Sequence, residues 1–444
     1  MWEYKYMKKI LLLKLKHLSR LVLKKYKPKI IGITGSVGKT TTKEACRVVL
    51  DKHFRVRATY KNFNNEIGLP LTIIGIDKAP GKSIYSWLLV FFKVFYLLFF
   101  KDKKYPQLLI LEMGIDRPGD MDYLTSIVQV DVAIVTGVSA SHLEFFSKIE
   151  NIKEEKAKLI KSLKKNGTAI INYDNEFSKT MEDLSKANVI SYGLNSDAQL
   201  KVEDVLYNFN KFFNEEISIE KINGISLKFN WNGSIVPAKI NNVISISAVY
   251  GALAAVSSAL ALNLNLVQAV EGLTDFTMPK GRMNVLEAIK NSYVIDDTYN
   301  SSPASSISAL ELLKQIKFKK SRKIVVLGEM LELGGYSEAG HREVGKNISD
   351  LNPSYLITVG KKTRDIIRGA KEKGYDKSKC FYFNNTEEAG KFLQEKMKEG
   401  DLVLIKGSQG ARMEKVVKEV MARPLQAKDI LIRQEKSWLW IFYF

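Results

Sequence analysis

The stretch from residue 29 to residue 42 most constrains what this chain can fold into. It reads KIIGITGSVGKTTT, which predicts a buried strand, a turn with two glycines and the threonine-rich start of a helix. In that order, backbone N–H groups of the turn and of the helix N-terminus face one point, where they can bind phosphate oxygens. The strict phosphate-loop spacing would need glycine where the chain has Ile33, so the general pattern fits only from Gly38 onward. We predict a nucleotide-binding loop, because the alternative, an ordinary turn with an exposed lysine, leaves three consecutive threonines unexplained.

The polar residues of this loop have distinct expected roles. The lysine of such a loop reaches the outer phosphates, and the hydroxyl of the next residue is placed to bind Mg²⁺. Here these residues are Lys39 and Thr40. The candidate phosphate-binding residues are Gly35, Ser36, Val37, Gly38, Lys39, Thr40 and Thr41.

The net charge of +20 over 444 residues implies an anionic partner. Residues 5–29 contain ten Lys or Arg residues and no acidic residue, which is half of the excess. In this segment the basic residues are combined with apolar residues at helical spacing, and no aromatic side chains that could stack on bases are interleaved with them. We therefore expect no nucleic-acid partner. The two cysteines, Cys46 and Cys380, have no metal-type spacing, which favours free thiols in a reducing cytoplasm.

Residues 7–26 predict a basic amphipathic helix. Its apolar face holds Leu11, Leu15, Leu18 and Val22, and its basic face holds Lys9, Lys16, Arg20 and Lys24. Such a helix suits the surface of an anionic bilayer, so we expect the protein to be peripheral on the inner face of the cytoplasmic membrane. The alternative is a helix docked on its own domain.

Residues 83–100 form a second apolar segment, SIYSWLLVFFKVFYLLFF. Its length approaches that of a thin bilayer span, but Lys93 lies near its centre. A single crossing would also place the phosphate loop and the next predicted strand on opposite sides of the membrane. We therefore expect an interfacial or re-entrant helix, with burial inside the fold as the alternative.

Strand patterns continue on both sides of the chain's midpoint. An apolar strand at 108–114 contains Glu112, at the edge where doubly wound sheets place metal ligands, although a lone glutamate there is more often solvated. Residues 195–240 predict a short-stranded β excursion. After residue 279, strands at 293–297, 323–327, 355–359 and 401–405 alternate with helical stretches and predict a second parallel α/β unit.

An ordered series of motifs carries a family resemblance. It comprises TGSVGKTT (34–41), NFNNEIGLP (62–70), LEMG (111–114), SHLE (141–144), DDTYNSSP (296–303), VLGEMLELG (326–334), SEAGHREVG (337–345) and IKGSQGARME (405–414). Together these motifs resemble the Mur ligases, ATP-dependent enzymes that form amide bonds in peptidoglycan synthesis. The later motifs are similar to the branch that adds D-alanyl-D-alanine to a UDP-MurNAc-peptide carboxylate through an acyl phosphate.

The residue patterns and the resemblance together predict an α/β architecture in three parts. A basic amphipathic helix (1–28) precedes a central P-loop ATPase domain with a mostly parallel sheet (29–278), and a Rossmann-like α/β domain follows (279–444). The resemblance implies ATP and Mg²⁺ as cofactors, and a nucleotide- or lipid-linked muramyl peptide and D-Ala-D-Ala as substrates. We expect a monomer.

The resemblance further assigns residue roles. Lys39, His142 and Lys156 would be catalytic. One Mg²⁺ would be held by Thr40 and Glu112, and a second by His142 and carbamylated Lys156, although composition alone favours a solvated Glu/Lys helix face around residue 156. Nucleotide contacts would come from Arg282, Asp297 and Asn300, and substrate contacts from Asn62, Asn64, Asn65, Lys406, Ser408 and Arg412.

Two departures from the family pattern leave alternatives open. Only 28 residues precede the first predicted strand, where the family carries a domain that holds the uridine nucleotide. Ser247 and Gly251 stand where relatives have His and Asn, which puts one nucleotide contact in doubt. The alternatives are a Mur-type ligase with another acceptor, such as a lipid-linked one, and a non-enzymatic nucleotide switch at the membrane. Glu112, His142 and Lys156 favour the enzyme, because a switch needs no second metal site.

Overall fold

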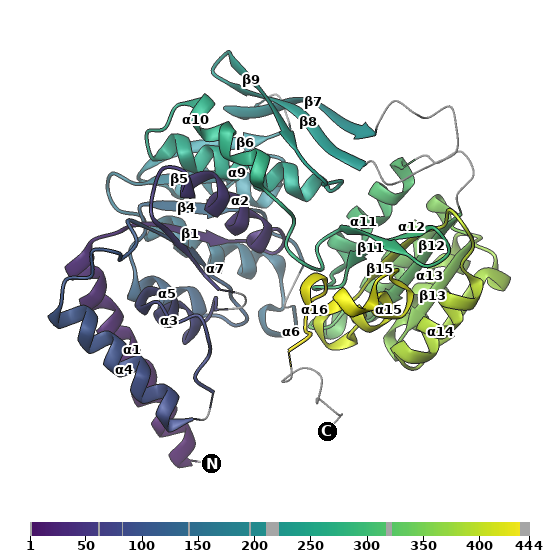
Figure 1. Cartoon of the computed structure of the whole chain (residues 1–444), viewed down its shortest axis with the longest axis horizontal. Helices are drawn as coiled ribbons and strands as arrows, with labels where there is room; N and C mark the ends of the chain where they lie inside the picture. Colours follow the sequence, from purple (N-terminus) through teal and green to yellow (C-terminus); the bar gives the residue numbers. More distant parts are fainter. Residues whose placement is uncertain are drawn as a thin grey trace.

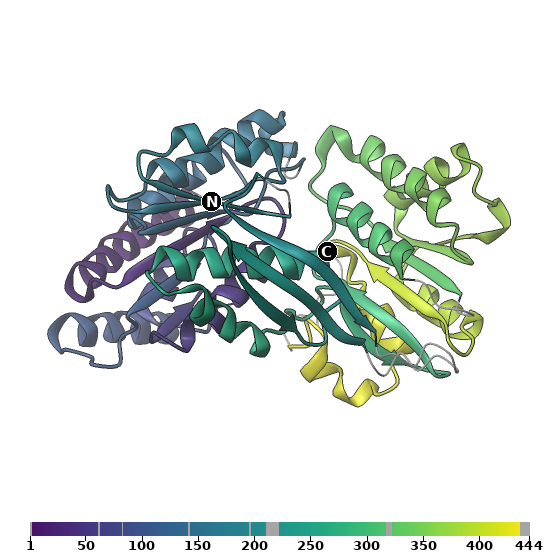
Figure 2. The same ribbon diagram turned by 90° about the horizontal axis from the view of Figure 1, so that it is seen from above.

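A computed structural model of the chain describes residues 2–60, 63–81, 83–140, 143–194, 197–209, 222–316 and 322–435. Over these residues the chain forms two sheets, each covered by helices on both faces (Figure 1). The first sheet and its helices make a central domain, and the second sheet and its helices make a C-terminal domain beside it (Figure 2). This arrangement confirms the predicted α/β fold class.

The central sheet has the strand order β2-β3-β1-β4-β5-β6-β7-β8-β9 in the described part of the chain. Its strands are β1 (Lys29–Thr34), β2 (Val56–Ala58), β3 (Leu108–Glu112), β4 (Val132–Val135), β5 (Thr168–Asn172), β6 (Asn188–Gly193), β7 (Leu200–Phe209), β8 (Ile222–Trp231) and β9 (Ser234–Ile240). Pairs from β2 to β7 are parallel, whereas β7, β8 and β9 pair antiparallel in the segment predicted as a β excursion. Strand β1 lies between β3 and β4, so its carboxyl end opens at the middle of the parallel part.

Two helical layers cover the central sheet because its strands are apolar on both sides. One layer consists of α2 (Lys39–Asp51), α9 (Ile246–Ala261) and α10 (Leu266–Glu271). The opposite layer consists of α1 (Trp2–Tyr26), α3 (Gly68–Ile74), α4 (Ile84–Phe99), α5 (Asp120–Ile127) and α7 (Ile149–Lys161). The short helices α6 (Leu143–Phe146) and α8 (Glu176–Lys179) follow β4 and β5. Successive residues of β1 alternate between the layers, Ile31 and Ile33 packing in one core and Ile30 in the other.

The C-terminal sheet has the order β10-β11-β15-β12-β13-β14 over the described residues. Its strands are β10 (Asn284–Ala288), β11 (Ser292–Asp297), β12 (Lys323–Gly328), β13 (Tyr355–Val359), β14 (Cys380–Phe383) and β15 (Leu402–Lys406). Its helices are α11 (Pro303–Gln315), α12 (Ser337–Leu351), α13 (Arg364–Glu372), α14 (Thr386–Lys396), α15 (Glu414–Val420) and α16 (Ala427–Ile430). Apart from antiparallel β10, all pairs are parallel, and the four strands predicted here coincide with β11, β12, β13 and β15 to within one residue.

Helix α1 packs its apolar face on its own domain. Leu15 and Val22 are fully buried in the core shared with α3, α4 and α5, and Leu11 and Leu18 are partly buried there. This face is therefore closed to a bilayer, and the alternative of docking on the domain is correct for it. The reason is that α3, α4 and α5 supply an apolar surface that covers it.

Helix α4 is held against α1 at the end where both helices finish. The Lys25 amine donates to the carbonyls of Leu97, Leu98 and Phe100 at 2.9, 3.0 and 2.8 Å, and the Tyr26 hydroxyl donates to Leu97 O at 3.0 Å. These carbonyls are the unpaired acceptors of the last helical turn, where a cation also complements the helix dipole. In the described part of the chain, no helix is both long and apolar enough to cross a membrane.

Candidate active site

The predicted phosphate loop connects β1 to α2, and glycines with left-handed backbone conformations shape it. Gly38 is the N-cap of α2 with φ 88°, and Gly35 has φ 151°. The loop is tied to the segment after β4, because Ser36 N donates to Gly137 O at 2.8 Å and Thr136 Oγ1 donates to Val37 O at 2.6 Å. The α2 N-terminus is left with no side-chain cap, as an anion-binding helix end requires.

We expect Gly35→Ala to weaken nucleotide binding at least tenfold and to lower the melting temperature. A Cβ at position 35 would lie 1.9 Å from Thr136 Oγ1, so the loop or its tether must shift. Gly233→Ala is the control: its φ of +87° also lies in the region that L side chains rarely adopt, and a Cβ there meets none of the described atoms within 4 Å. Titration of both variants with ADP, alongside thermal melts, tests this. Equal effects of the two substitutions would contradict a tether that fixes the loop.

Thr40 and Glu112 meet at the carboxyl ends of β1 and β3. The Thr40 hydroxyl donates to Glu112 Oε2 at 3.2 Å, and Asn64 Nδ2 donates to Oε1 of the same carboxylate at 3.0 Å. Glu112 is 3% exposed, so the more common solvated glutamate is excluded. Lys39 donates to Gly35 O at 2.7 Å, and burial lowers the pKa of its amine against the opposing effect of the Glu112 charge. The set places oxygen ligands and a cation around one point at the helix N-terminus.

Lys156 lies on α7 with only 1% of its surface exposed. Burial lowers the pKa of its amine well below the usual range, and the positive charge of Lys39 adds to the effect. Its neighbour Glu155 is also buried, and Glu155 Oε1 accepts from Gly119 N and Met121 N at 3.1 and 2.8 Å. The structure therefore overturns the solvated helix face that composition alone favours.

The remaining loop residues are placed in part. Asn65 Oδ1 accepts from Gly68 N at 2.9 Å at the start of α3, and Asn65 lines the large cavity described below. Asn62 and His142 lie outside the described residues, so their predicted roles stay predictions. The second metal site is accordingly represented only by Lys156.

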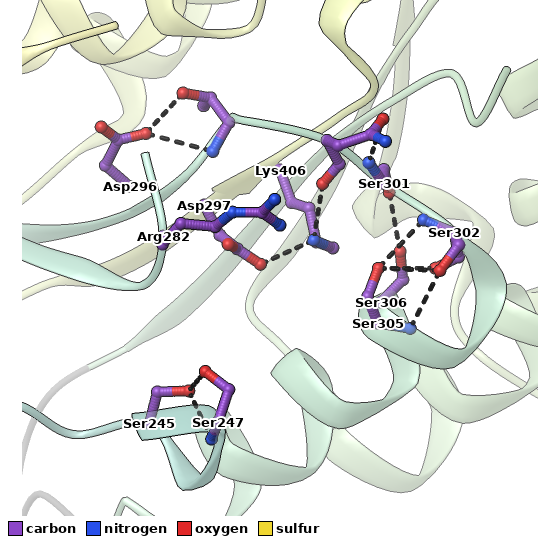
Figure 3. Close-up of polar contacts among 12 residues, drawn as sticks. Ser245, Ser247, Arg282, Asp296, Asp297, Ser301, Ser302, Ser305, Ser306 and Lys406 are labelled. Atoms are coloured by element: carbon purple, nitrogen blue, oxygen red, sulfur yellow. Dashed lines mark hydrogen bonds and ion pairs between the residues drawn. The ribbon is translucent and has the colours of Figure 1, made fainter. Parts of the chain in front are cut away.

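The C-terminal domain contributes a second group of polar residues (Figure 3). Lys406 donates to Asp297 Oδ2 at 2.6 Å and to the Asn300 carbonyl at 2.9 Å, and both side chains of this ion pair are almost fully buried. Burial lowers the pKa of the Lys406 amine, and the Asp297 charge opposes that shift. The Arg282 guanidinium stacks on Tyr299, 4.1 Å from the ring centroid, and its buried Nε has no hydrogen-bond partner among the described residues. The Tyr299 phenol interacts in turn with Thr40, which links the two domains at the phosphate loop.

The three residues predicted to contact the substrate, Lys406, Ser408 and Arg412, differ in whether their side chains line a cavity or are occupied by contacts within the protein. Ser408 Oγ donates to Ser301 O at 3.1 Å and accepts from Leu331 N at 2.9 Å, which occupies its hydroxyl with two neighbouring loops. Arg412 Nε donates to buried Glu414 at 2.6 Å. Of the three, only Lys406 lines a cavity described here. The structure thus brings buried Ser408 and partly buried Arg412 near the site as groups that brace neighbouring loops, and their predicted substrate contacts stay predictions.

Asp296, next to Asp297, is a buried carboxyl. Its Oδ1 accepts from Thr298 N at 3.2 Å and from Thr298 Oγ1 at 2.6 Å (Figure 3), while Oδ2 has no partner in the described part of the chain. Burial raises the pKa of this carboxyl to about 7. It therefore fixes the turn after β11 that carries Tyr299 and Asn300.

Two cavities meet at the phosphate loop and share Val37, Gly38, Arg282 and Ser305. The larger, about 900 Å³, is lined from the central domain by Lys39, Thr40, Asn64 and Glu112 and from the C-terminal domain by Tyr299 and Asn300. The smaller, about 380 Å³, is lined by Thr41, Asp297 and Lys406. A nucleotide in the smaller cavity would present its phosphates to the loop and to the larger cavity.

Sequence reasoning missed several residues that line these cavities. Tyr250 on α9 donates to Asp174 Oδ2 at 2.9 Å in the wall of the smaller cavity. Asp116 and Arg117 line the larger cavity. No local pattern marks Asp116, Arg117 or Asp174, because they follow strands β3 and β5, whose places in the sheet only the fold defines, and Tyr250 reaches Asp174 from a helix far along the chain. Gly251 lies against Thr41, where a Cβ would approach Thr41 Cγ2 to 3.1 Å, so the glycine allows close packing of α9 on α2.

Comparison with known proteins identifies the family. The Mur ligase middle domain matches residues 33–83 and 93–249, and the domain described as "Mur ligase, glutamate ligase domain" matches residues 281–409. This chain belongs to the Mur ligase family. Among individual Mur ligases, it is similar to the UDP-N-acetylmuramoyl-tripeptide--D-alanyl-D-alanine ligases of Rickettsia prowazekii (32% identity, covering 88% of this chain and 78% of the relative) and Bacillus subtilis (28%, 93% and 80%).

Solved Mur ligase structures share the fold. MurF ligase from Thermotoga maritima in complex with ADP superposes with a TM-score of 0.75 at 26% identity, covering 94% of this chain and 84% of that one. MurF from Acinetobacter baumannii gives a TM-score of 0.75 at 24% identity, covering 91% and 79%. These similarities confirm the family resemblance drawn from the motifs.

Proposed function

We propose that this Mur ligase adds D-alanyl-D-alanine to the carboxylate of a UDP-MurNAc-tripeptide, at the expense of ATP. The observation that carries the proposal is the meeting of the two cavities at the phosphate loop, with Lys39, Thr40 and Glu112 on one side and Arg282 and Asn300 on the other. The names of the relatives from R. prowazekii and B. subtilis supply the substrates.

The proposed reaction has two steps. The γ-phosphoryl group of ATP passes to the substrate carboxylate, giving ADP and an acyl phosphate. The amine of the dipeptide then attacks the acyl carbon, phosphate leaves, and a proton is released as the amide forms. Lys39 and the N–H groups of the α2 N-terminus would neutralise the charge on the transferring phosphoryl group, and Arg282 would add a cation from the opposite wall.

The residues at the loop fit a magnesium ion. A hydroxyl and a carboxylate are hard oxygen ligands, and Mg²⁺ takes one or two protein ligands, the rest being phosphate oxygens and water. Thr40 and Glu112 would hold it, and Asn64 orients the carboxylate by its hydrogen bond to Oε1. When bound, the metal would supply charge stabilisation at the phosphates.

Lys156 would act as a carbamate. A neutral amine attacks CO₂ and loses a proton, which yields a carbamate with two oxygen ligands. The lowered pKa of the buried Lys156 amine favours the neutral form that this reaction needs. The carbamate would place a negative charge beside the Lys39 ammonium group, whereas an unmodified, protonated Lys156 would repel Lys39.

We expect phosphate release from ATP only when both substrates are present. The measurement is phosphate release with UDP-MurNAc-tripeptide and D-Ala-D-Ala, each alone and together, with mass spectrometry of the product. A separate arm replaces the nucleotide-linked peptide by a lipid-linked one, because Lys8 and Leu12 of α1 line the larger cavity. Phosphate release without any carboxylate substrate, or at a rate that does not depend on D-Ala-D-Ala, would contradict the proposed reaction.

A further inference from the structure

Helix α4 carries an apolar stripe that the fold leaves uncovered. Ile84, Leu88, Phe92, Phe95 and Phe99 follow one another at intervals of four, four, three and four residues, so they share one face of the helix. Their exposed fractions are 78, 60, 69, 51 and 69%. We call these five residues the α4 stripe. Scattered apolar residues on a surface are ordinary, but a contiguous row of this size marks an interaction site.

Part of the α4 stripe lies outside the family's middle-domain match: Ile84, Leu88 and Phe92 fall in its gap, whereas Phe95 and Phe99 lie within it. The middle-domain match stops at residue 83 and resumes at residue 93, so the first half of α4 lies in the gap. The opposite face of the helix is fixed, because Val90, Val94 and Leu97 are buried and Lys25 holds the last turn. Figure 1 shows α1 and α4 extending together beyond the rest of the central domain, away from the C-terminal domain.

Basic residues gather at the end of this pair of helices. Lys24 and Lys27 at the end of α1, and Lys101, Lys103 and Lys104 after α4, are all exposed. We call these five lysines the basic cluster. Residues 24–27 contain no acidic residue, and residues 101–104 contain one, Asp102, which is only partly exposed. An apolar row next to clustered lysines matches the acyl and headgroup layers of an anionic bilayer, where long lysine side chains reach the phosphates.

We propose that the α4 stripe and the basic cluster dock this protein on an anionic lipid bilayer. A helix of 16 residues is about 24 Å long, shorter than the roughly 30 Å hydrocarbon core, so α4 lies in the interface. A second copy of this chain is a poorer occupant, because two proteins that each carry a net charge of +20 repel one another. Since Lys8 and Leu12 of α1 also line the larger cavity, docking holds that cavity close to the lipid surface.

The test is sedimentation of the full chain with vesicles of phosphatidylglycerol and phosphatidylcholine, compared with phosphatidylcholine alone. We expect binding to the anionic vesicles that weakens as salt rises, since each surface lysine contributes about fivefold. Phe92→Asp combined with Phe95→Asp should reduce binding at least tenfold. Leu425→Asp, which changes a 98%-exposed leucine elsewhere, is the matched control and should leave binding unchanged. Lys101→Glu combined with Lys103→Glu should reduce binding to the anionic vesicles and should leave any binding to phosphatidylcholine vesicles unchanged.

Each other outcome overturns the proposal. Failure to bind anionic vesicles at low salt, or equal loss in the Leu425→Asp control, excludes the α4 stripe as a lipid-docking face. A concentration-dependent dimer that Phe92→Asp abolishes, without vesicle binding, assigns the face to a second copy. Both aspartates lie on exposed positions, so unchanged ADP affinity and thermal melting would show that the variants are folded. Because ADP binding is measured separately, failure of docking leaves the proposed ligase reaction unaffected.

Discussion

Replacing Lys39 by alanine is expected to abolish ATP turnover, with a loss of at least about 10²–10³-fold, the usual cost of removing one preorganised charge from a transition state. Lys39 is the loop's cation, and its amine donates to Gly35 O at 2.7 Å, from where a rotation of the side chain would bring it to a phosphate. The measurement is phosphate release under saturating substrates, with ADP affinity determined in parallel. The backbone N–H groups remain in the variant, so ADP affinity should fall less than the rate.

Lys391→Ala is the matched control for that experiment. Lys391 is exposed on α14, far from the loop in sequence and on the other sheet, and its loss should leave the rate unchanged. A folded Lys39→Ala protein that keeps near-normal turnover would show that the loop does not hold the transferring phosphoryl group. Circular dichroism and melting temperature establish that the variant is folded.

Replacing Lys156 by alanine should remove most of the activity, on the order of a hundredfold, because one oxygen ligand and its negative charge disappear from the site. Bicarbonate should not restore the rate, since alanine has no amine to carbamylate. A short carboxylic acid such as formate or acetate, small enough to enter the space left by the side chain, should restore part of it. The measurement is phosphate release from ATP with both substrates, across a concentration series of each additive.

Lys161→Ala tests whether this effect is specific to the buried lysine. Lys161 lies on the same helix, α7, but is exposed, so its loss should leave the rate unchanged and acetate should have no effect. Full activity in Lys156→Ala would remove the carbamate from the mechanism. Loss of activity without rescue, in a protein that melts at a lower temperature, would instead assign Lys156 a structural role.

Much of the candidate site follows from local sequence. The run from β1 into α2 specifies its own conformation, because an apolar strand, two glycines that accept positive φ and a helix start leave the backbone N–H groups pointing at one place. The apolar strands of both sheets are equally local signals, and they gave the fold class. The order of motifs along the chain then gave the family.

Tertiary structure decided which side chains leave water. Lys156 lies in a Glu/Lys-rich stretch that predicts a solvated face, yet it is buried, because α7 packs Ile152 and Ile160 and with them Lys156 toward the sheet. Glu112 stands out as a candidate metal ligand because two distant residues contact its carboxylate: Asn64, 48 residues earlier, and Thr40, 72 residues earlier. No periodicity encodes such contacts, since they depend on strand order in the sheet.

The membrane-type segments show the same division. The sequence alone determined that residues 7–26 form a basic amphipathic helix and that residues 83–100 form an apolar one. It did not determine which faces are free, because burial depends on neighbours far along the chain. Packing on α3, α4 and α5 closed the apolar face of α1, whereas the α4 stripe, with Phe92 at its centre, stayed exposed. An amphipathic pattern thus reports that a face will be covered, and only the assembled fold decides whether the protein itself covers it.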